Sequence, residues 1–253
     1  MPNEVTPKKQ NESGHAKLLE SLDRLIANGS NLDQGRLDPP ADLTIAALQA
    51  VLTQGTLLHG NVGNSKADFR TIALDRTTVV DKFDAVAAQS VGQLAGRGAS
   101  VETVEDARSY VRKLQGARSK PKATQDPNSP NFDPTEKNIS ASQQSSAAKI
   151  SNFLELVDFL EAQPEYAEVR QSGVKISDLR ALAQSAQTKH TSSIAAVARL
   201  DTDRNDRNKF FYLDDGNICD LAARYKNLVK GVFGAGSVEY KTINAIPFKK
   251  RKL

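Results

Sequence analysis

Residues 174–211 read VKISDLRALAQSAQTKHTSSIAAVARLDTDRNDRNKFF and contain no proline. They belong to a longer proline-free stretch, 165–246, and a second such stretch covers 41–120. Proline lacks a backbone N–H and collides with the preceding turn, which costs about 3 kcal/mol inside a helix. The alternation of apolar and polar residues that a strand would show is nearly absent. We therefore predict an all-α protein with long helices.

The two halves of the sequence can be aligned with each other. Leu19–Ala27 matches Leu154–Ala162, and the proline-free stretches match at an offset of 131 residues. The identical pairs at this offset are Ile45 and Ile176, Leu48 and Leu179, Ala50 and Ala181, His59 and His190, Ala67 and Ala198, Thr71 and Thr202, Asp75 and Asp206, and Arg76 and Arg207. We predict two tandem copies of a helical unit, which form up-and-down bundles or merge into one pseudo-symmetric bundle.

Proline and glycine set the expected boundaries. Residues 117–138 contain four prolines and only one large apolar residue, Phe132, which is typical of a linker. The predicted layout is a disordered N-terminus (1–14), helical repeat 1 (15–116), the proline-rich linker (117–138), helical repeat 2 (139–247) and a basic tail (248–253).

Two glycine patterns predict local features of repeat 1. Asn28-Gly29 predicts a helix stop, because glycine tolerates the left-handed conformation that follows many helices. Three glycines at positions 55, 60 and 63 predict a kink near 60–64, because each costs about 1 kcal/mol in a helix.

The composition restricts the kind of core. Hydrophobic residues make up 39% of the 253 residues, aromatic residues only 6%, and tryptophan is absent, so the core must rely on aliphatic side chains. A large ligand pocket usually has more aromatic lining, which argues against a small-molecule enzyme. Cys219 is the only cysteine, so an internal disulfide and a thiolate metal cluster are both excluded. With no signal peptide and no membrane span in the sequence, we expect a cytoplasmic protein.

The positive charge is concentrated at the C-terminus. The isoelectric point is near 9.1 and the net charge is +4, and Lys249, Lys250, Arg251 and Lys252 alone supply four positive charges. These residues could bind nucleic acid or another acidic surface weakly, or serve only as a solubilising end.

Several motifs resemble a known family. They are Asn138–Gln143, Gln163–Ala167, Asp206–Lys209 and, most specifically, Val229–Gly234 followed by Ser237, Tyr240 and Lys241. Together they resemble an uncharacterised bacterial family of two-repeat all-helical proteins with a C-terminal V-K-x-V-F-G-x-x-S-x-x-Y-K motif. The resemblance covers most of residues 15–248 and implies the fold and the boundaries. It implies no activity, and the ending Lys249–Lys252 departs from the family pattern.

Two sets of residues are candidate sites. His59 and His190 occupy the same position in each copy, so they could meet as a metal site or a pH switch, or each could be a partly buried histidine that donates to a neighbour. Asp75-Arg76 and Asp206-Arg207 could form ion pairs between helices inside the bundle, with a structural role in fixing register. We expect no cofactor.

The helical pattern without a catalytic constellation favours a non-enzymatic interaction or structural protein. Its long, coiled-coil-like helices would offer a surface to a protein partner or to a second copy of the chain. The alternatives are a protein that associates weakly with nucleic acid through the basic tail, and a metal-binding bundle that uses His59 and His190.

Overall fold

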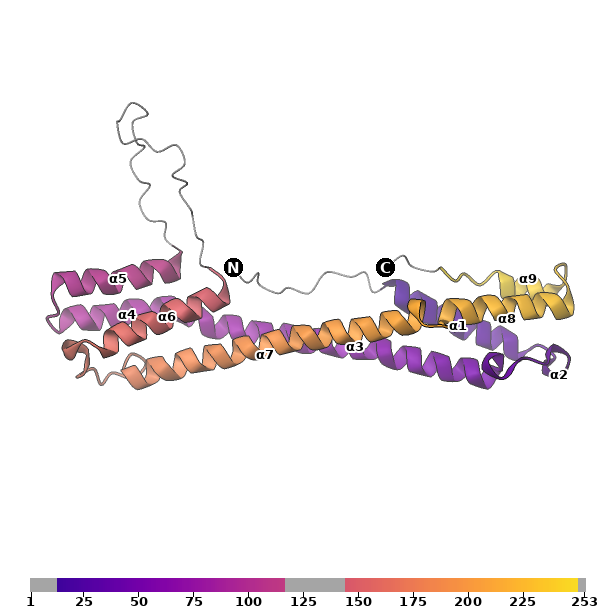
Figure 1. Ribbon diagram of the computed structural model, residues 1–253, viewed down its shortest axis with the longest axis horizontal. Coiled ribbons are helices and arrows are strands. Elements are labelled where there is room, and N and C mark those ends of the chain that lie inside the picture. The colour runs from indigo at the N-terminus through magenta and orange to yellow at the C-terminus, as the bar shows by residue number, and fades with distance from the viewer. Residues whose placement is uncertain (1–12, 117–143, 250–253) are drawn as a thin grey trace, which may run out of the picture. The chain divides into compact units, whose positions relative to one another are not determined.

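The computed structural model describes residues 13–116 and 144–249, and every regular element in these ranges is helical (Figure 1). The helices are α1 (Ser13–Ser30), α2 (Gln34–Leu37), α3 (Ile45–Val80), α4 (Lys82–Gly96), α5 (Val101–Gln115), α6 (Ser146–Glu161), α7 (Ile176–Asn208), α8 (Ile218–Phe233) and α9 (Val238–Asn244). Short 3-10 turns lie at Ala41–Leu43 and Pro164–Tyr166, and a π-helical turn lies at Lys209–Leu213. The predicted all-α fold is confirmed.

Three predicted segments fall wholly or mainly outside the described residues. They are residues 1–12 of the predicted N-terminus (1–14), the whole linker 117–138, and residues 250–253 of the basic tail (248–253). Within the described ranges, no helix is long and apolar enough to cross a lipid bilayer.

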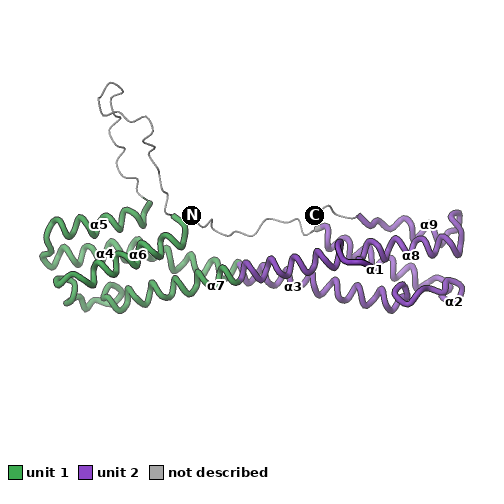
Figure 2. The backbone as a smooth tube through the Cα atoms, viewed as in Figure 1, with its two compact units in different colours: residues 1–5, 70–195 green, residues 6–69, 196–253 purple. Residues whose placement is uncertain are grey.

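The described chain forms two compact units (Figure 2). Unit 1 spans Arg70–Ala195 and so contains the end of α3, then α4, α5 and α6, and the beginning of α7. Unit 2 joins Thr6–Phe69 to Ala196–Leu253, and so contains α1, α2, the beginning of α3, the end of α7, α8 and α9. Each unit therefore takes helices from both predicted repeats. The order of the main helices is also the same in both halves: a helix, a 3-10 turn, a long helix and two further helices.

Unit 1 has an apolar core between α4, α5 and α6. The rings of Phe83 and Phe153 stack with centroids 4.1 Å apart and planes 1° from parallel. Leu94, Leu114 and Leu160 are almost completely buried around them. Such offset aromatic pairs contribute about 1 kcal/mol beyond the area that they bury.

Unit 2 packs α1 against α8 and α9. Leu22 and Leu25 of α1 and Ile218 and Tyr225 of α8 are completely buried. Burial raises the pKa of the Tyr225 hydroxyl. That hydroxyl lies where a Cβ on Gly29 would be, only 2.5 Å from the ideal position. Gly29 is therefore needed for the close approach of Tyr225.

Two local predictions concern repeat 1. Helix α1 ends at Ser30, one residue after the predicted stop at Asn28-Gly29, but Gly29 has no positive φ, so the predicted left-handed conformation was wrong. Residues 60–64 lie inside α3, which is one continuous helix from Ile45 to Val80, so the predicted kink was wrong. Packing of one face of α3 against its neighbours outweighs the weak helix propensity of its three glycines.

Candidate functional site

Helices α3 and α7 pair in opposite directions in each unit. In unit 2, Asp68 of α3 forms an ion pair with Arg199 of α7, with 3.9 Å between the charged atoms. In unit 1, Asp75 of α3 forms one with Lys189 of α7 at 3.0 Å. A later residue of α3 thus meets an earlier residue of α7, as in an antiparallel pair.

The buried face of α7 follows the spacing of a coiled coil. Its buried or half-buried residues recur after alternating steps of three and four, and they are Leu179, Ala183, Ala186, His190, Ser193, Val197, Leu200, Arg204, Arg207 and Phe211 just beyond its end. This 3.5-residue period keeps one stripe of a helix against its partner. The stripe contains two arginines, Arg204 and Arg207, in positions where apolar residues are usual.

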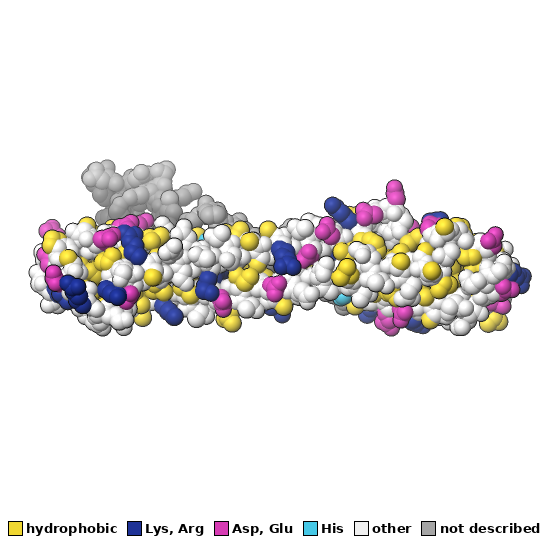
Figure 3. All heavy atoms as spheres, turned by 90° about the horizontal axis from the view of Figure 1, so that it is seen from below, with side chains coloured by type: hydrophobic (Ala, Val, Ile, Leu, Met, Phe, Trp, Pro, Cys, Tyr) yellow, Lys and Arg dark blue, Asp and Glu magenta, His cyan; other side chains and the backbone are white. Residues whose placement is uncertain are grey.

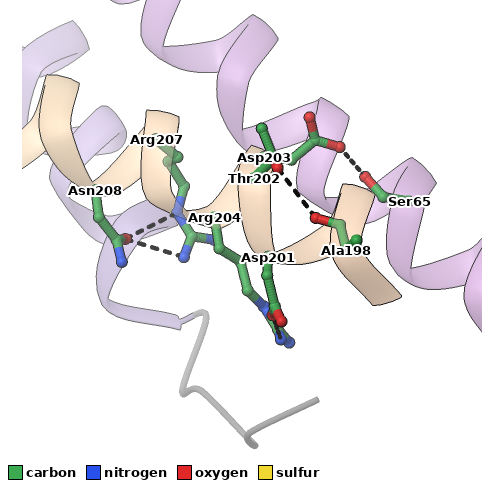
Figure 4. Close-up of polar contacts among 8 residues, drawn as sticks. All are labelled: Ser65, Ala198, Asp201, Thr202, Asp203, Arg204, Arg207 and Asn208. Atoms are coloured by element: carbon green, nitrogen blue, oxygen red, sulfur yellow. Dashed lines mark hydrogen bonds and ion pairs between the residues drawn. The ribbon is translucent and has the colours of Figure 1, made fainter. Parts of the chain in front are cut away.

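Figure 4 shows Arg207 beside Asn208 and Arg204 beside Asp201. Arg207 is completely buried, and its Nη2 donates a hydrogen bond to Oδ1 of the neighbouring Asn208 at 3.2 Å. Arg204 is 4% exposed and forms an ion pair with Asp201 at 3.5 Å. Burying a charged group costs several kcal/mol unless polar groups surround it. The two buried arginines therefore need polar neighbours.

A second polar contact joins α3 to α7 in the same unit. The Ser65 hydroxyl donates a hydrogen bond to the Asp203 carboxylate, as Figure 4 shows, and Ser65 is only 1% exposed. From this contact and the Asp68–Arg199 pair, the antiparallel register places His59 within about one turn of Arg207. The inner face of α3 thus meets the polar part of α7.

Histidine and aromatic rings complete the layer. His15 of α1 is completely buried, with its ring centroid 6.3 Å from that of His59. The rings of Phe211 and Tyr212 each lie 5.6 Å from His15. We call His15, His59, Ser65, Asp203, Arg204, Arg207, Asn208 and Tyr212 the polar layer of unit 2.

A π-helical turn explains why two consecutive aromatic residues are both buried. The backbone N–H of Asp214 donates to the carbonyl of Lys209 at 3.0 Å, an i to i+5 hydrogen bond that widens the turn. Residues next to each other in an α-helix are about 100° apart around the axis, so only one usually faces a core. The wider turn lets Phe211 and Tyr212 both point inward, and single π turns are frequent at functional sites.

The outer face of α3 in unit 2 is unusual in a different way. Residues 45–65 contain no Asp, Glu, Lys or Arg over 21 positions. One stripe of this face is exposed, at alternating steps of three and four, and consists of Ala50, Thr53, Leu57, Gly60, Asn64 and Ala67. Leu57 is 57% exposed. Exposed helix faces normally carry charges, so we call this stripe, with Gly63 beside it, the neutral face of α3.

The sequence-based candidates end up in different places. His59 lies in unit 2 and His190 in unit 1, and no three His, Cys, Asp or Glu side chains among the described residues group as metal ligands. Asp75 pairs with Lys189 on the surface, whereas the Nη1 of Arg76 lies 3.5 Å from the Ser193 hydroxyl. Asp206 is exposed, although Arg207 beside it is buried.

The remaining candidates lie near the C-terminus. Lys249 is exposed, whereas Lys250, Arg251 and Lys252 lie outside the described residues. Cys219 is buried at the start of α8, where its N–H donates to the Asn217 side chain at 3.1 Å.

Several members of the polar layer, including His15, Arg204 and Asn208, were not predicted from the sequence. The coiled-coil spacing would have placed Arg204 on the buried stripe, seven residues before Phe211 and four after Leu200. His15 and Asn208 give no such signal. Comparisons of the chain with family models, with curated proteins and with solved structures found no match.

Proposed function

We propose that this is a non-enzymatic helical protein that acts by binding another protein chain through the neutral face of α3, and that the chain bound is a second copy of itself. The observation that carries the proposal is the exposed, uncharged stretch 45–65. Figure 3 shows one face of the molecule, and in its right-hand part hydrophobic side chains gather in the middle while charged ones lie mainly along the edges.

Two of the three glycines of α3 support a close contact on the outside. Gly55 has an internal reason, because a Cβ there would lie 2.8 Å from Leu19 and 3.3 Å from Phe211. Gly60 and Gly63 have none, since a Cβ at either position would meet nothing within 4 Å. Each costs about 1 kcal/mol of helix stability relative to alanine. A partner helix crossing close to the backbone would account for that cost.

The pattern of large and small residues is self-complementary. A two-fold interface brings the same surface patch of both copies together. If two α3 helices cross in opposite directions at Gly60, Leu57 of each copy lies level with Gly63 of the other. The exposed Leu57 side chain of each copy then meets the open space at Gly63 of the other copy.

The polar layer contributes by holding α3 in one position. Polar and charged groups in a helical seam tend to fix register rather than to add stability. A single register between α3 and α7 keeps Leu57, Gly60 and Gly63 aligned on one rigid face.

Sedimentation equilibrium of the full chain tests the proposal. We expect a monomer–dimer equilibrium that Leu57→Glu shifts to monomer, because a charge would be buried at the contact. Gln49→Glu adds the same charge to α3 at an exposed position about three turns along the helix from Gly60, and we expect it to leave the dimer intact. A wild-type chain that stays monomeric at all concentrations would refute self-association, and so would equal effects of the two substitutions.

A further inference from the structure

The positive charge of the chain is not confined to its last residues. Residues 226–253 contain seven Lys or Arg and one acidic residue, Glu239, which leaves 27 basic and 29 acidic residues in the rest of the chain. Three of the seven, Lys226, Lys230 and Lys241, belong to α8 and α9 of unit 2. The basic region therefore begins within the folded hairpin of these two helices.

Lys226 fixes where the chain leaves this hairpin. Its Nζ donates to the carbonyls of Asn244 at 3.2 Å and Ile246 at 2.6 Å, and lies 5.3 Å from the centre of the Phe248 ring. Burial lowers the pKa of this amine. Since one side chain of α8 holds the residues that follow α9, Lys249 begins beside α8.

Lys230 and Lys241 are free to bind an anion. Helices α8 and α9 run in opposite directions, so Lys230, one turn after Lys226, lies about level with Lys241. Both are exposed, and no carboxylate in the described part of the chain forms an ion pair with either. Arg224 on the same helix differs, because Asp42 neutralises it at 2.5 Å.

Two aromatic residues come directly before two of the exposed lysines. Tyr240 precedes Lys241 and Phe248 precedes Lys249, and both rings are half-buried at the edge of the unit 2 core. Lysines contact the phosphates of a nucleic acid strand, and bases stack on aromatic rings whatever their sequence. Exposed lysines with half-exposed rings next to them in the chain are therefore suited to an unpaired strand.

We propose that the surface formed by Lys230, Tyr240, Lys241, Phe248 and Lys249 binds single-stranded nucleic acid without sequence specificity. This surface is separate from the neutral face of α3, so a result that contradicts one proposal leaves the other unaffected.

The test measures binding of a fluorescently labelled single-stranded oligouridine to the full chain over a range of salt concentrations. Removing both lysines in Lys230→Gln/Lys241→Gln should weaken binding about 25-fold at 0.1 M salt, or about fivefold for each lost phosphate contact. The slope of log affinity against log salt should become shallower by about 1.4. The control Lys17→Gln/Lys82→Gln removes two exposed lysines elsewhere, and should leave both quantities unchanged.

Further variants separate the parts of the surface. Lys249→Gln should weaken binding further, and Tyr240→Leu should reduce the preference for the single strand over a duplex of the same sequence. Circular dichroism melting of each variant checks that the hairpin is folded. Absence of salt-dependent binding overturns the proposal, as does wild-type affinity in Lys230→Gln/Lys241→Gln. Binding to phosphatidylserine vesicles without binding to the oligonucleotide also overturns it, in favour of a lipid surface.

Discussion

Unit 1 and unit 2 are built from the same kinds of helices but differ at their centres. Each contains parts of α3 and α7 together with shorter helices: α4, α5 and α6 in unit 1, and α1, α8 and α9 in unit 2. Aligned positions differ in polarity. The pairs, unit 1 first, are Ile150 and His15, Ile72 and Asp203, and Ala73 and Arg204.

The core of unit 1 is mainly apolar, around the stacked Phe83 and Phe153, and its buried polar residues, Ser90, Asn152 and Ser193, are uncharged. Unit 2 keeps a polar layer that costs desolvation. The polar layer packs against the inner side of α3, whose outer side is the neutral face. We therefore attribute the polar layer to the need to hold that face in one position.

The largest expected effect comes from removing a buried charge in one unit and its aligned counterpart in the other. Arg207→Ala in unit 2 should lower the free energy of unfolding by about 3 kcal/mol, because it leaves buried polar partners without their donor. Arg76→Ala in unit 1 should lower it by about 1 kcal/mol, because Arg76 is only half-buried. Urea denaturation followed by circular dichroism measures both.

Arg207→Met is the matched control, since an apolar side chain of similar length fills the space. It should cost less than Arg207→Ala. Equal losses in Arg207→Ala and Arg76→Ala would show that the polar layer of unit 2 is no different from the seam of unit 1.

A smaller change in stability is expected from replacing glycines on the inner and outer sides of α3 in unit 2. Its sign should differ between the two sides. Gly55→Ala should destabilise the protein by about 1–3 kcal/mol, because the new methyl group would collide with Leu19. Gly60→Ala should stabilise the monomer by up to about 1 kcal/mol through helix propensity alone. Thermal unfolding at low protein concentration gives both values, and a loss in Gly60→Ala would contradict an open outer face.

The smallest effect concerns one surface carboxyl in each unit. In unit 2 the hydrogen bond from Arg224 holds the pKa of Asp42 below its ordinary value of 3.8, and in unit 1 Arg108 does the same for Glu105. A lowered pKa in the folded state gives stability above the unfolded pKa that is lost as the pH falls through the folded pKa. Arg224→Gln should therefore raise the pKa of Asp42 and remove its part of the acid sensitivity.

NMR titration of the two carboxyl groups measures this change directly. Glu105 should keep its lowered pKa in Arg224→Gln, because its own arginine is untouched. A shift at Glu105, or none at Asp42, would contradict the assignment of each carboxyl to its arginine.

Much of the fold was predictable because local chemistry sets it. The proline-free stretches gave α3 and α7, and Ser100 caps α5 as its position before an acidic first turn suggests, with its hydroxyl accepting from Thr103 at 3.1 Å. The role of Gly29 was not predictable, because it depends on Tyr225, nearly 200 positions away in the sequence.

The candidate site was predictable only in part, for the same reason. The alignment of the halves singled out His59 and Arg207, and the missing charges of residues 45–65 are visible in the sequence. The approach of His15 to His59, and the π turn that buries Tyr212, depend on contacts between distant segments.

The central claim, that α3 crosses α3 of a second copy at Gly60, is tested most directly by disulfide trapping. A disulfide needs Cα atoms about 4.4–6.8 Å apart, so Gly60→Cys should give a covalent dimer rapidly under a mild oxidant. Gln49→Cys places a thiol at another exposed position of the same helix, away from the crossing, and should remain monomeric, while Cys219 is buried. If Gly60→Cys forms no covalent dimer, or forms it no faster than Gln49→Cys, the claim is wrong.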